Sequence, residues 1–290
     1  MTVTARLSVH IEEFRYPDAT VALADIRLDV APGEFCGILG ANGSGKTTLL
    51  KAMDGLVKEY TGRVLLDGAD VKRLHPRDIY RKVGLVFQNP DDQLFASSVF
   101  EDVAFGPRNM GLAEGEVSTR VAAALESVEM AELAGKQIHA LSHGQKKRVC
   151  IAGLLAMGHE VLLLDEPTAG LDPMGEYRMM ELLTRLNRDE GVTVVMATHS
   201  VDLVPLFLHR LHILSRGRLV RGGTPEEVFT APEELAGVKL RLPQIAELIW
   251  RLKHEDRLPF ARLPLTIGEA RRELVAALEQ AAAARPEGKP

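Results

Sequence analysis

Hydrophobic and polar positions alternate through the first 34 residues, for example at Leu7, Val9 and Ile11. A period of two residues turns every second side chain to the same face, so this stretch predicts antiparallel strands. Further along, short runs are apolar at nearly every position, which is typical of strands buried on both faces of a parallel sheet. These runs lie at 35–39, 83–87, 161–166 and 192–197, and the third ends in two acidic residues.

Apolar residues at helical spacing separate these runs. The spacing follows the first run over 49–57, returns from about 97 to 130, and returns again over 146–157 and 177–186. A hairpin over 211–220 closes this part of the chain. Strands that alternate with helices in this way predict an α/β fold with a mainly parallel sheet.

The pattern changes near residue 231. Two helical segments carry narrow apolar seams over 245–252 and 270–278, and 266–269 matches a capping box at the start of the second segment. This amphipathic region either packs on the preceding domain or holds a partner subunit, and its pattern fits both arrangements. The tail, 284–290, has the composition of a disordered segment.

A glycine-rich stretch with the pattern G-x-x-x-x-G-K-[ST] joins the first apolar run to the helix after it. Such a turn points backbone N–H groups into one concavity at the positive end of a helix, which suits phosphate. Lys46 is placed to reach the β- and γ-phosphates of a nucleotide, and the Thr47 hydroxyl to bind Mg²⁺. The alternative is a glycine-rich turn with a chance Lys-Thr pair. The candidate ATP-binding residues here are Gly40, Asn42, Gly43, Ser44, Gly45, Lys46, Thr47 and Thr48.

Polar residues stand where three of the buried runs end. Asp165 and Glu166 close one run, and the carboxyl edge of a parallel sheet is where ligands bind in such folds. Because side chains alternate along a strand, Asp165 can hold Mg²⁺ while Glu166 acts as general base toward a water molecule. Gln88 can contact the metal or the water, and His199 can donate a hydrogen bond to the γ-phosphate. Taken alone, the Asp-Glu pair would be a helix N-cap and the histidine a structural residue.

Tyr16 has two interpretations. It is either a half-buried aromatic residue of a strand or, because it precedes the phosphate loop, a ring that stacks on adenine.

Composition limits the class of partner and the cellular compartment that the chain can have. The chain has 290 residues, 46% hydrophobic, with a formal net charge of −5, so no overall charge favours nucleic acid. Cys36 and Cys150 lie in apolar surroundings and are interpreted as small core residues in a reducing compartment. No apolar run approaches the roughly 18 residues that span a bilayer, and no signal peptide is visible. We therefore expect a cytosolic chain whose membrane contact goes through a partner.

The motifs together resemble the set found in ABC transporter ATPases, over roughly residues 5–230. They are, in order, GANGSGKTT, the glutamine of VFQNPDDQ, LSHGQKKR, VLLLDEPTAGLDP and the histidine of MATHS. The resemblance implies a head-to-tail dimer in which each ATP lies between one chain's glycine loop and the other chain's signature. The residues that it implies on the signature side are Ser142, Gly144, Gln145 and Asp172.

One position departs from the family pattern. The usual Leu-Ser-Gly-Gly-Gln has His143 at its third residue, which puts in doubt the backbone freedom there and the tightness of the closed dimer. The phosphate contact through Ser142 and the Gly144 amide is expected to survive, since both lie at a helix N-terminus.

Longer segments resemble energy-coupling factor transporters, most closely their cobalt or nickel branch. These segments are QNPDDQLFASSVFEDVAFGPRNMGL, LSHGQKKRVCIAGLLAM, LRLPQIAELIW and LPLTIGEARREL. The resemblance implies an ATPase at the cytoplasmic face of the cell membrane that powers uptake of a metal ion, with a vitamin or another nutrient as the alternative cargo. Its partners would be a second copy of the chain or a related ATPase, a membrane coupling subunit that docks near 88–105, and a substrate-binding membrane subunit.

Two other classes of function were weighed. An ABC ATPase that acts on nucleic acid or the ribosome often carries two ATPase units, a coiled-coil insertion or a basic arm, which this chain lacks. A soluble P-loop kinase would not need the signature segment. The expected architecture is therefore a P-loop ABC ATPase domain over 1–230, with an antiparallel β subdomain and a helical signature subdomain over about 90–160. A helical extension over 231–290 follows it.

Overall fold

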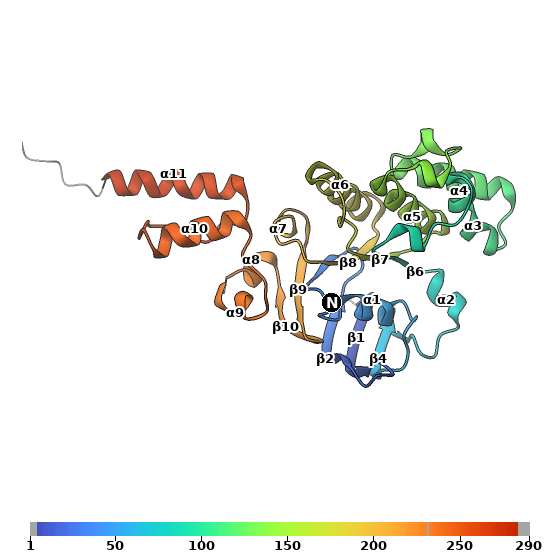
Figure 1. Cartoon of the computed structure of the whole chain (residues 1–290), viewed down its shortest axis with the longest axis horizontal. Helices are drawn as coiled ribbons and strands as arrows, with labels where there is room; N and C mark the ends of the chain where they lie inside the picture. Colours follow the sequence, from blue (N-terminus) through green and yellow to red (C-terminus); the bar gives the residue numbers. More distant parts are fainter. Residues whose placement is uncertain (1–4, 231, 284–290) are drawn as a thin grey trace, which may run out of the picture.

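A six-stranded sheet forms the centre of the computed structural model, which describes residues 5–230 and 232–283 (Figure 1). Its strands are β3 (Phe35–Leu39), β6 (Val83–Val86), β7 (Val161–Asp165), β8 (Thr193–Thr198), β9 (Arg210–Ser215) and β10 (Arg218–Gly223). They run in the order β10-β9-β3-β8-β7-β6, all parallel except β10, which forms the expected hairpin with β9. Every residue of β3, β6, β7 and β8 is buried, as continuous apolar runs predict.

A second, antiparallel sheet packs beside the first in the order β2-β1-β4-β5. Its strands are β1 (Leu7–Arg15), β2 (Val21–Val30), β4 (Thr61–Leu66) and β5 (Ala69–Asp70). Val9 pairs with Leu28 on one side and with Val64 on the other, and all three side chains are buried. The alternation in the first 34 residues thus sets which face of this sheet enters the core.

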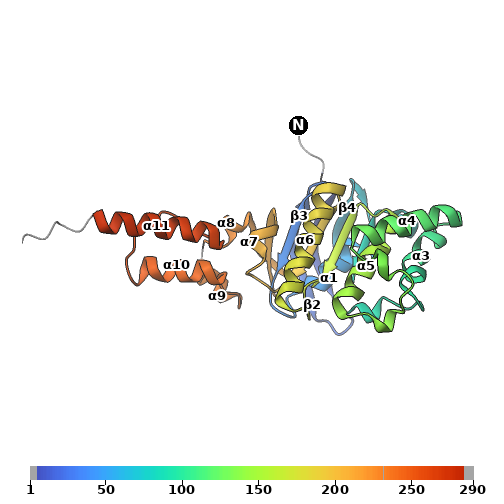
Figure 2. The same cartoon turned by 90° about the horizontal axis from the view of Figure 1, so that it is seen from above.

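Helices cover both faces of the central sheet. They are α1 (Lys46–Met53), α2 (Pro76–Tyr80), α3 (Val99–Asn109), α4 (Glu114–Ser127), α5 (His143–Met157), α6 (Pro173–Glu190) and α7 (Val204–Phe207), with short 3-10 turns at Pro90–Asp92, Ala131–Leu133 and Ile138–Ala140. Leu49, Leu50 and Met53 of α1 are fully buried in a core shared with both sheets. Helices α3, α4 and α5 gather beyond β6 (Figures 1 and 2). The predicted α/β architecture, with a mainly parallel core sheet and an antiparallel β subdomain, is confirmed.

Two helix boundaries differ from the sequence pattern. The segment 97–130 divides into α3 and α4, because Gly111 takes a left-handed φ of 82° between them. Helix α5 begins at His143 and not at Lys146. Ser142 caps it: the Ser142 side chain accepts from the Gln145 amide, and the Gln145 side chain accepts from the Ser142 amide. Its first turn is polar, so hydrophobic spacing alone misses it.

The extension contains α8 (Pro225–Val228), α9 (Pro232–Gly237), α10 (Gln244–His254) and α11 (Ile267–Ala283). Helices α10 and α11 lie side by side and project away from the sheets, on the side opposite α3 and α4 (Figures 1 and 2). The base of the extension joins the main core through buried residues such as Leu242 and Ala246, while Leu248 and Leu278 stay exposed. The region therefore packs on the preceding domain at its base, and its two apolar seams pack against each other through Ile249, Ala270 and Ala277. The expected disordered tail lies outside the described residues.

The capping box expected at 266–269 forms in a modified way. The Thr266 hydroxyl accepts from the Glu269 amide at 3.3 Å, but the Glu269 carboxylate accepts from the Leu265 amide at 3.1 Å, one residue earlier than a reciprocal box requires. The Glu269 amide at this helix start is therefore capped, although the box is not reciprocal.

Candidate nucleotide-binding site

The glycine-rich loop between β3 and α1 requires glycine at two positions. Gly45 has a φ of 107°, and a Cβ there would lie 2.6 Å from the Ala22 carbonyl oxygen. A Cβ at Gly40 would lie 2.4 Å from the Leu214 carbonyl oxygen. The loop thus turns tightly against two neighbouring strands and delivers the chain into α1, whose first-turn amides have no partner within the helix. Backbone donors at a helix start favour an anion.

Two polar side chains of this loop are buried at the start of α1. Lys46 is 6% exposed, and its Nζ donates to the carbonyl oxygens of Gly40 at 2.8 Å and Ala41 at 3.3 Å. The Ser44 Oγ is buried and has no hydrogen-bond partner among the described residues. The Ser44 hydroxyl is thus free to contact a ligand, and the positive charge of Lys46 beside it favours an anion such as a triphosphate.

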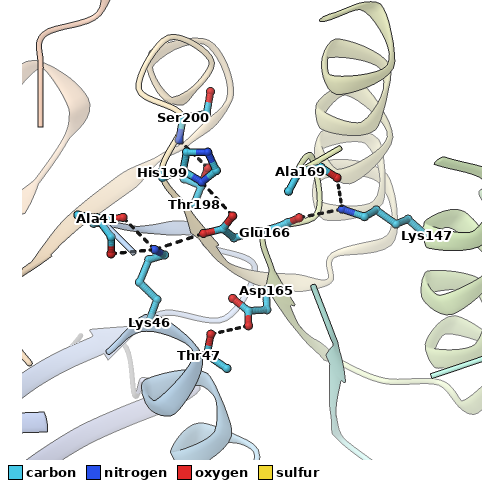
Figure 3. A network of polar contacts seen from close by, with 11 residues as sticks. Ala41, Lys46, Thr47, Lys147, Asp165, Glu166, Ala169, Thr198, His199 and Ser200 are labelled. Atoms are coloured by element: carbon cyan, nitrogen blue, oxygen red, sulfur yellow. Dashed lines mark hydrogen bonds and ion pairs between the residues drawn. The ribbon is translucent and has the colours of Figure 1, made fainter. Parts of the chain in front are cut away.

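Thr47 and Asp165, 118 residues apart in sequence, meet at the carboxyl edge of the sheet (Figure 3). The Thr47 hydroxyl donates to Asp165 Oδ2 at 2.6 Å. Burial raises the pKa of Asp165, and the hydrogen bond from Thr47 opposes that shift. A hydroxyl oxygen and a carboxylate beside the phosphate cradle are the oxygen donors that Mg²⁺ prefers, so the residues present fit this ion.

Glu166 points its carboxylate into the same site (Figure 3). One carboxylate oxygen lies 3.3 Å from Lys46 Nζ, and the other lies 2.9 Å from His199 Nδ1. The side chain of Glu166 is 8% exposed, whereas that of His199 is 55% exposed and lines a separate cavity with residues 200–202 and 239–241. A buried carboxylate held between a lysine and a histidine has a fixed direction, as a proton acceptor needs.

A cavity of about 380 Å³ opens over these groups. It is lined by Tyr16, Thr20, Val21, Ala22, Asn42, Gly43, Ser44, Gly45, Lys46, Thr47, Thr48, Gln88 and Glu166. Tyr16 follows the end of β1, its ring is 41% exposed, and its hydroxyl lies 2.7 Å from Thr48 Oγ1. Most of the predicted nucleotide contacts therefore share one cavity of a size that is normal for a small-molecule ligand.

A second cavity, of about 550 Å³, lies at the N-terminus of α5. It is lined by residues of 129–148 and 170–179, including Ser142, His143, Gly144, Gln145, Gly170, Leu171, Asp172 and Arg178. The Asp172 side chain caps α6 by accepting from the Gly175 amide at 2.7 Å. His143 packs on Gly170, where an added Cβ would lie 3.3 Å from His143 Nε2. The departing signature residue thus contacts the turn that begins at Gly170.

The two cavities share no lining residue. The structure brings Tyr16, Gln88 and Glu166 to the glycine loop, and it brings Ser142 and Asp172 together elsewhere. Each chain therefore presents two separate cavities, one at the glycine loop and one at the start of α5.

Two residues in or beside these cavities were not predicted from the sequence. Arg178 lines the second cavity from the second turn of α6, and Lys147 donates hydrogen bonds to the main chain at Glu166 and Ala169. Lys147 lies within LSHGQKKR, but the motif does not indicate that its side chain contacts Glu166, which is 19 residues further along the chain.

Within 5–230 and 232–283, no helix is long and apolar enough to cross a membrane. In the same ranges, no cluster of three or more His, Cys, Asp or Glu side chains is arranged to hold a metal ion. Cys36 and Cys150 are both buried and free, as expected.

A family model described as ABC transporter matches residues 23–169. An ABC transporter ATP-binding protein of Geobacter sulfurreducens is 77% identical over 94% of this chain and 98% of its own length. The energy-coupling factor transporter ATP-binding protein EcfA of Methanococcus maripaludis is 46% identical over 90% of this chain and 94% of its own.

Solved structures similar to this chain are also ABC ATP-binding proteins. CbiO1 from Clostridium perfringens, described as part of the ABC transporter complex cbiONQ, matches with a TM-score of 0.75 and 43% identity over 85% of this chain and 99% of its own. A dimeric ATP-binding cassette in a post-hydrolysis state, bound to ADP and Pi, matches with a TM-score of 0.66 and 28% identity over 76% of this chain and 98% of its own.

Proposed function

Since the chain belongs to the ABC transporter family, as an ATP-hydrolysing subunit of the energy-coupling factor type, we propose that it works as a head-to-tail pair that closes around two ATP molecules. One observation carries this proposal: each chain has two cavities with no lining residue in common. Residues of the glycine loop bind one ATP, and the signature cavity of the other copy seals it. The likeness to a dimeric cassette bound to ADP and Pi supports this arrangement.

In each site, Lys46 contacts the β- and γ-phosphates, and the free amides of the loop complete the cradle. Tyr16 stacks on the adenine at the cavity mouth. Thr47, Asp165 and Gln88 hold Mg²⁺, which neutralises charge on the phosphate oxygens when it is bound. The signature side adds Ser142, the Gly144 amide, Gln145 and Asp172 to the γ-phosphate end of the partner's nucleotide.

Glu166 is the general base. Its carboxylate takes a proton from a water molecule as the water oxygen bonds to the γ-phosphorus, and the bond from that phosphorus to the β,γ-bridging oxygen breaks to release ADP and phosphate. His199 Nδ1 lies 2.9 Å from a carboxylate oxygen of Glu166, and His199 donates a hydrogen bond to the γ-phosphate when ATP is bound. Hydrolysis removes the ligand that joins the two copies, so the pair reopens and moves its membrane partner.

The test is Glu166→Gln in the full chain. We expect ATP turnover to fall by roughly 10²- to 10⁴-fold, the usual contribution of a general base, with ATP retained in a stable dimer seen by size-exclusion chromatography. Glu190→Gln, at the exposed end of α6, is the matched control and should turn over ATP like the parent. Parent-rate hydrolysis by Glu166→Gln would remove the base assignment.

The transported substrate is proposed to be a transition-metal ion, cobalt first, and the chain to lie at the cytoplasmic face of the membrane. The support is the resemblance of its longer segments to the cobalt or nickel branch and its likeness to CbiO1. A membrane coupling subunit docks near 88–105, where Phe95 and Phe105 form an exposed aromatic pair with ring centroids 4.7 Å apart. Cobalt, nickel and vitamin uptake by cells that carry the parent or Lys46→Ala identifies the cargo. Uptake that ignores Lys46→Ala removes the transport claim.

The two copies are proposed to be identical, because one chain supplies both half-sites. A related ATPase as the second subunit is the alternative, and the composition of the purified membrane complex distinguishes the two.

A further inference from the structure

Lys147, in the second turn of α5, is a buried lysine whose contacts are all with neutral groups. It is 1% exposed, and its Nζ donates to the carbonyl oxygens of Glu166 at 2.9 Å and Ala169 at 2.7 Å (Figure 3). No carboxylate of the described residues forms an ion pair with it. Burial lowers its pKa to about 8. A methionine would fill the same space without the free-energy cost of burying a charge. The two hydrogen bonds therefore indicate a role for the lysine beyond filling space.

The segment that Lys147 holds carries the general base in an unusual conformation. Glu166 has a φ of 50°, a region that residues with a side chain rarely adopt and that persists only where the surroundings fix it. The Glu166 amide donates to the Ala197 carbonyl at 3.0 Å, and the Glu166 carbonyl accepts from the Ala169 amide at 3.1 Å and from Lys147. These bonds fix the main chain on the side opposite the carboxylate, which points to Lys46 and His199 (Figure 3).

The same side chain starts from the helix that serves the other half-site. The first turn of α5, from His143 to Gln145, lines the second cavity. Ala169, the other acceptor, directly precedes Gly170, which lines that cavity too. The buried ammonium of Lys147 thus connects the main chain of Glu166 with the two segments that line the second cavity, the start of α5 and the turn that leads into Gly170.

We propose that Lys147 is a positioning residue for the reaction, because it holds the turn 166–169 against α5. The Glu166 carboxylate then points toward the γ-phosphate site only while α5 keeps its position against this turn. The proposal rests on the function proposed above. Lys147 lines neither cavity and therefore acts through Glu166 and the turn, not by contact with ATP.

The experiment compares Lys147→Met with Lys147→Gln in the purified full chain. Both side chains are neutral and equally long, but only the glutamine amide can donate hydrogen bonds to the turn. We expect kcat for ATP to fall roughly 10- to 100-fold in Lys147→Met, as for a base displaced by about 1 Å, with KM within about twofold of the parent. Lys147→Gln should recover at least about threefold of that loss. Lys146→Met is the control: it removes one charge from the adjacent residue, whose Nζ pairs with Asp91 at 2.6 Å, and should stay within about twofold of the parent.

A double-mutant cycle separates positioning from a general structural effect. In the Glu166→Gln background, adding Lys147→Met should cause no further loss of turnover, because its effect passes through the base. Equal rates for Lys147→Met and the parent, equal losses in the Met and Gln variants, or additive losses in the cycle would each overturn the proposal. If Lys147→Met does not fold, the same cycle is run with Lys147→Gln. Loss of turnover in Glu166→Gln but not in Lys147→Met would leave the proposed function standing while the role of Lys147 fails.

Discussion

Replacing Tyr16 by alanine tests whether its ring holds the adenine of ATP. The ring is 41% exposed at the mouth of the 380 Å³ cavity, and it is steadied from behind by an edge contact with Phe14, at 5.1 Å between centroids. Its hydroxyl lies 2.7 Å from Thr48 Oγ1. Stacking of a base on an aromatic side chain contributes about 1–3 kcal/mol. Since 1.4 kcal/mol is a factor of ten, Tyr16→Ala should weaken ATP binding about 5- to 150-fold.

The assay is isothermal titration of the full chain with a non-hydrolysable ATP analogue and, separately, with inorganic tripolyphosphate. Tripolyphosphate has no base, so its affinity should be the same in the parent and Tyr16→Ala within about twofold. Tyr16→Phe keeps the ring and loses only a partly exposed neutral hydrogen bond to Thr48, so its affinity for the analogue should stay within about threefold. Unchanged analogue binding in Tyr16→Ala refutes stacking. An equal fall for both ligands also refutes it, because the loop near Thr48 would then have moved.

Three further outcomes follow from single contacts. Gly45→Ala, which forces a left-handed φ and a Cβ 2.6 Å from the Ala22 carbonyl oxygen, should lower the free energy of unfolding by at least about 2 kcal/mol in urea titrations. Thr47→Val removes the 2.6 Å bond to Asp165 and one metal-binding oxygen, so half-maximal ATPase activity should need about tenfold more Mg²⁺. Burial lowers the pKa of His212 to about 4, below the unfolded value of about 6.5. The unfolded state therefore binds the proton at a higher pH than the folded state does. The contribution of His212 to the free energy of unfolding is fully present above about pH 6.5 and should fall by about 3 kcal/mol as the pH is lowered to 4. His212→Leu should lack this part of the pH dependence, which urea titrations at several pH values measure.

The central sheet and the glycine loop could be predicted because their signals are local. A buried parallel strand is apolar at every position, and a polar residue that follows it marks the edge of the sheet. That rule brings Thr47 and Asp165 together in prediction as in structure, although 118 residues separate them. The signal needs no knowledge of how the rest of the chain packs.

The start of α5 was predictable from a rule that hydrophobic spacing does not contain. His143 to Gln145 are polar, so the apolar pattern begins only after them. Ser142 and Gln145 nevertheless have the three-residue spacing of a capping box, and both of its hydrogen bonds are present. A search for caps would have placed this boundary three residues earlier.

Lys147 and the positive φ of Glu166 could not be predicted in this way. A lysine in the early turns of a helix is expected at the surface, with its charge in water. It is buried here because the turn 166–169 folds over α5, and that contact depends on how β7, α5 and α6 are placed in three dimensions. Likewise, nothing in the residue type of Glu166 favours a φ of 50°; the bonds to Ala197, Ala169 and Lys147 impose it.

This connection has a thermodynamic consequence for the proposed pair. The cavities of one chain share no lining residue, so any influence of one ATP on the other must pass through the protein between them. The link at Lys147 is short and buried, and it consists of two hydrogen bonds from the lysine side chain to main-chain carbonyl oxygens, so α5 and the turn that carries Glu166 can move little relative to each other. Coupling of binding free energies is reciprocal. If binding of the partner's nucleotide stabilises the position of α5, and this position in turn orients Glu166, then the oriented Glu166 must favour that position of α5 by the same free energy. Each site is therefore ready for hydrolysis only when both sites are closed.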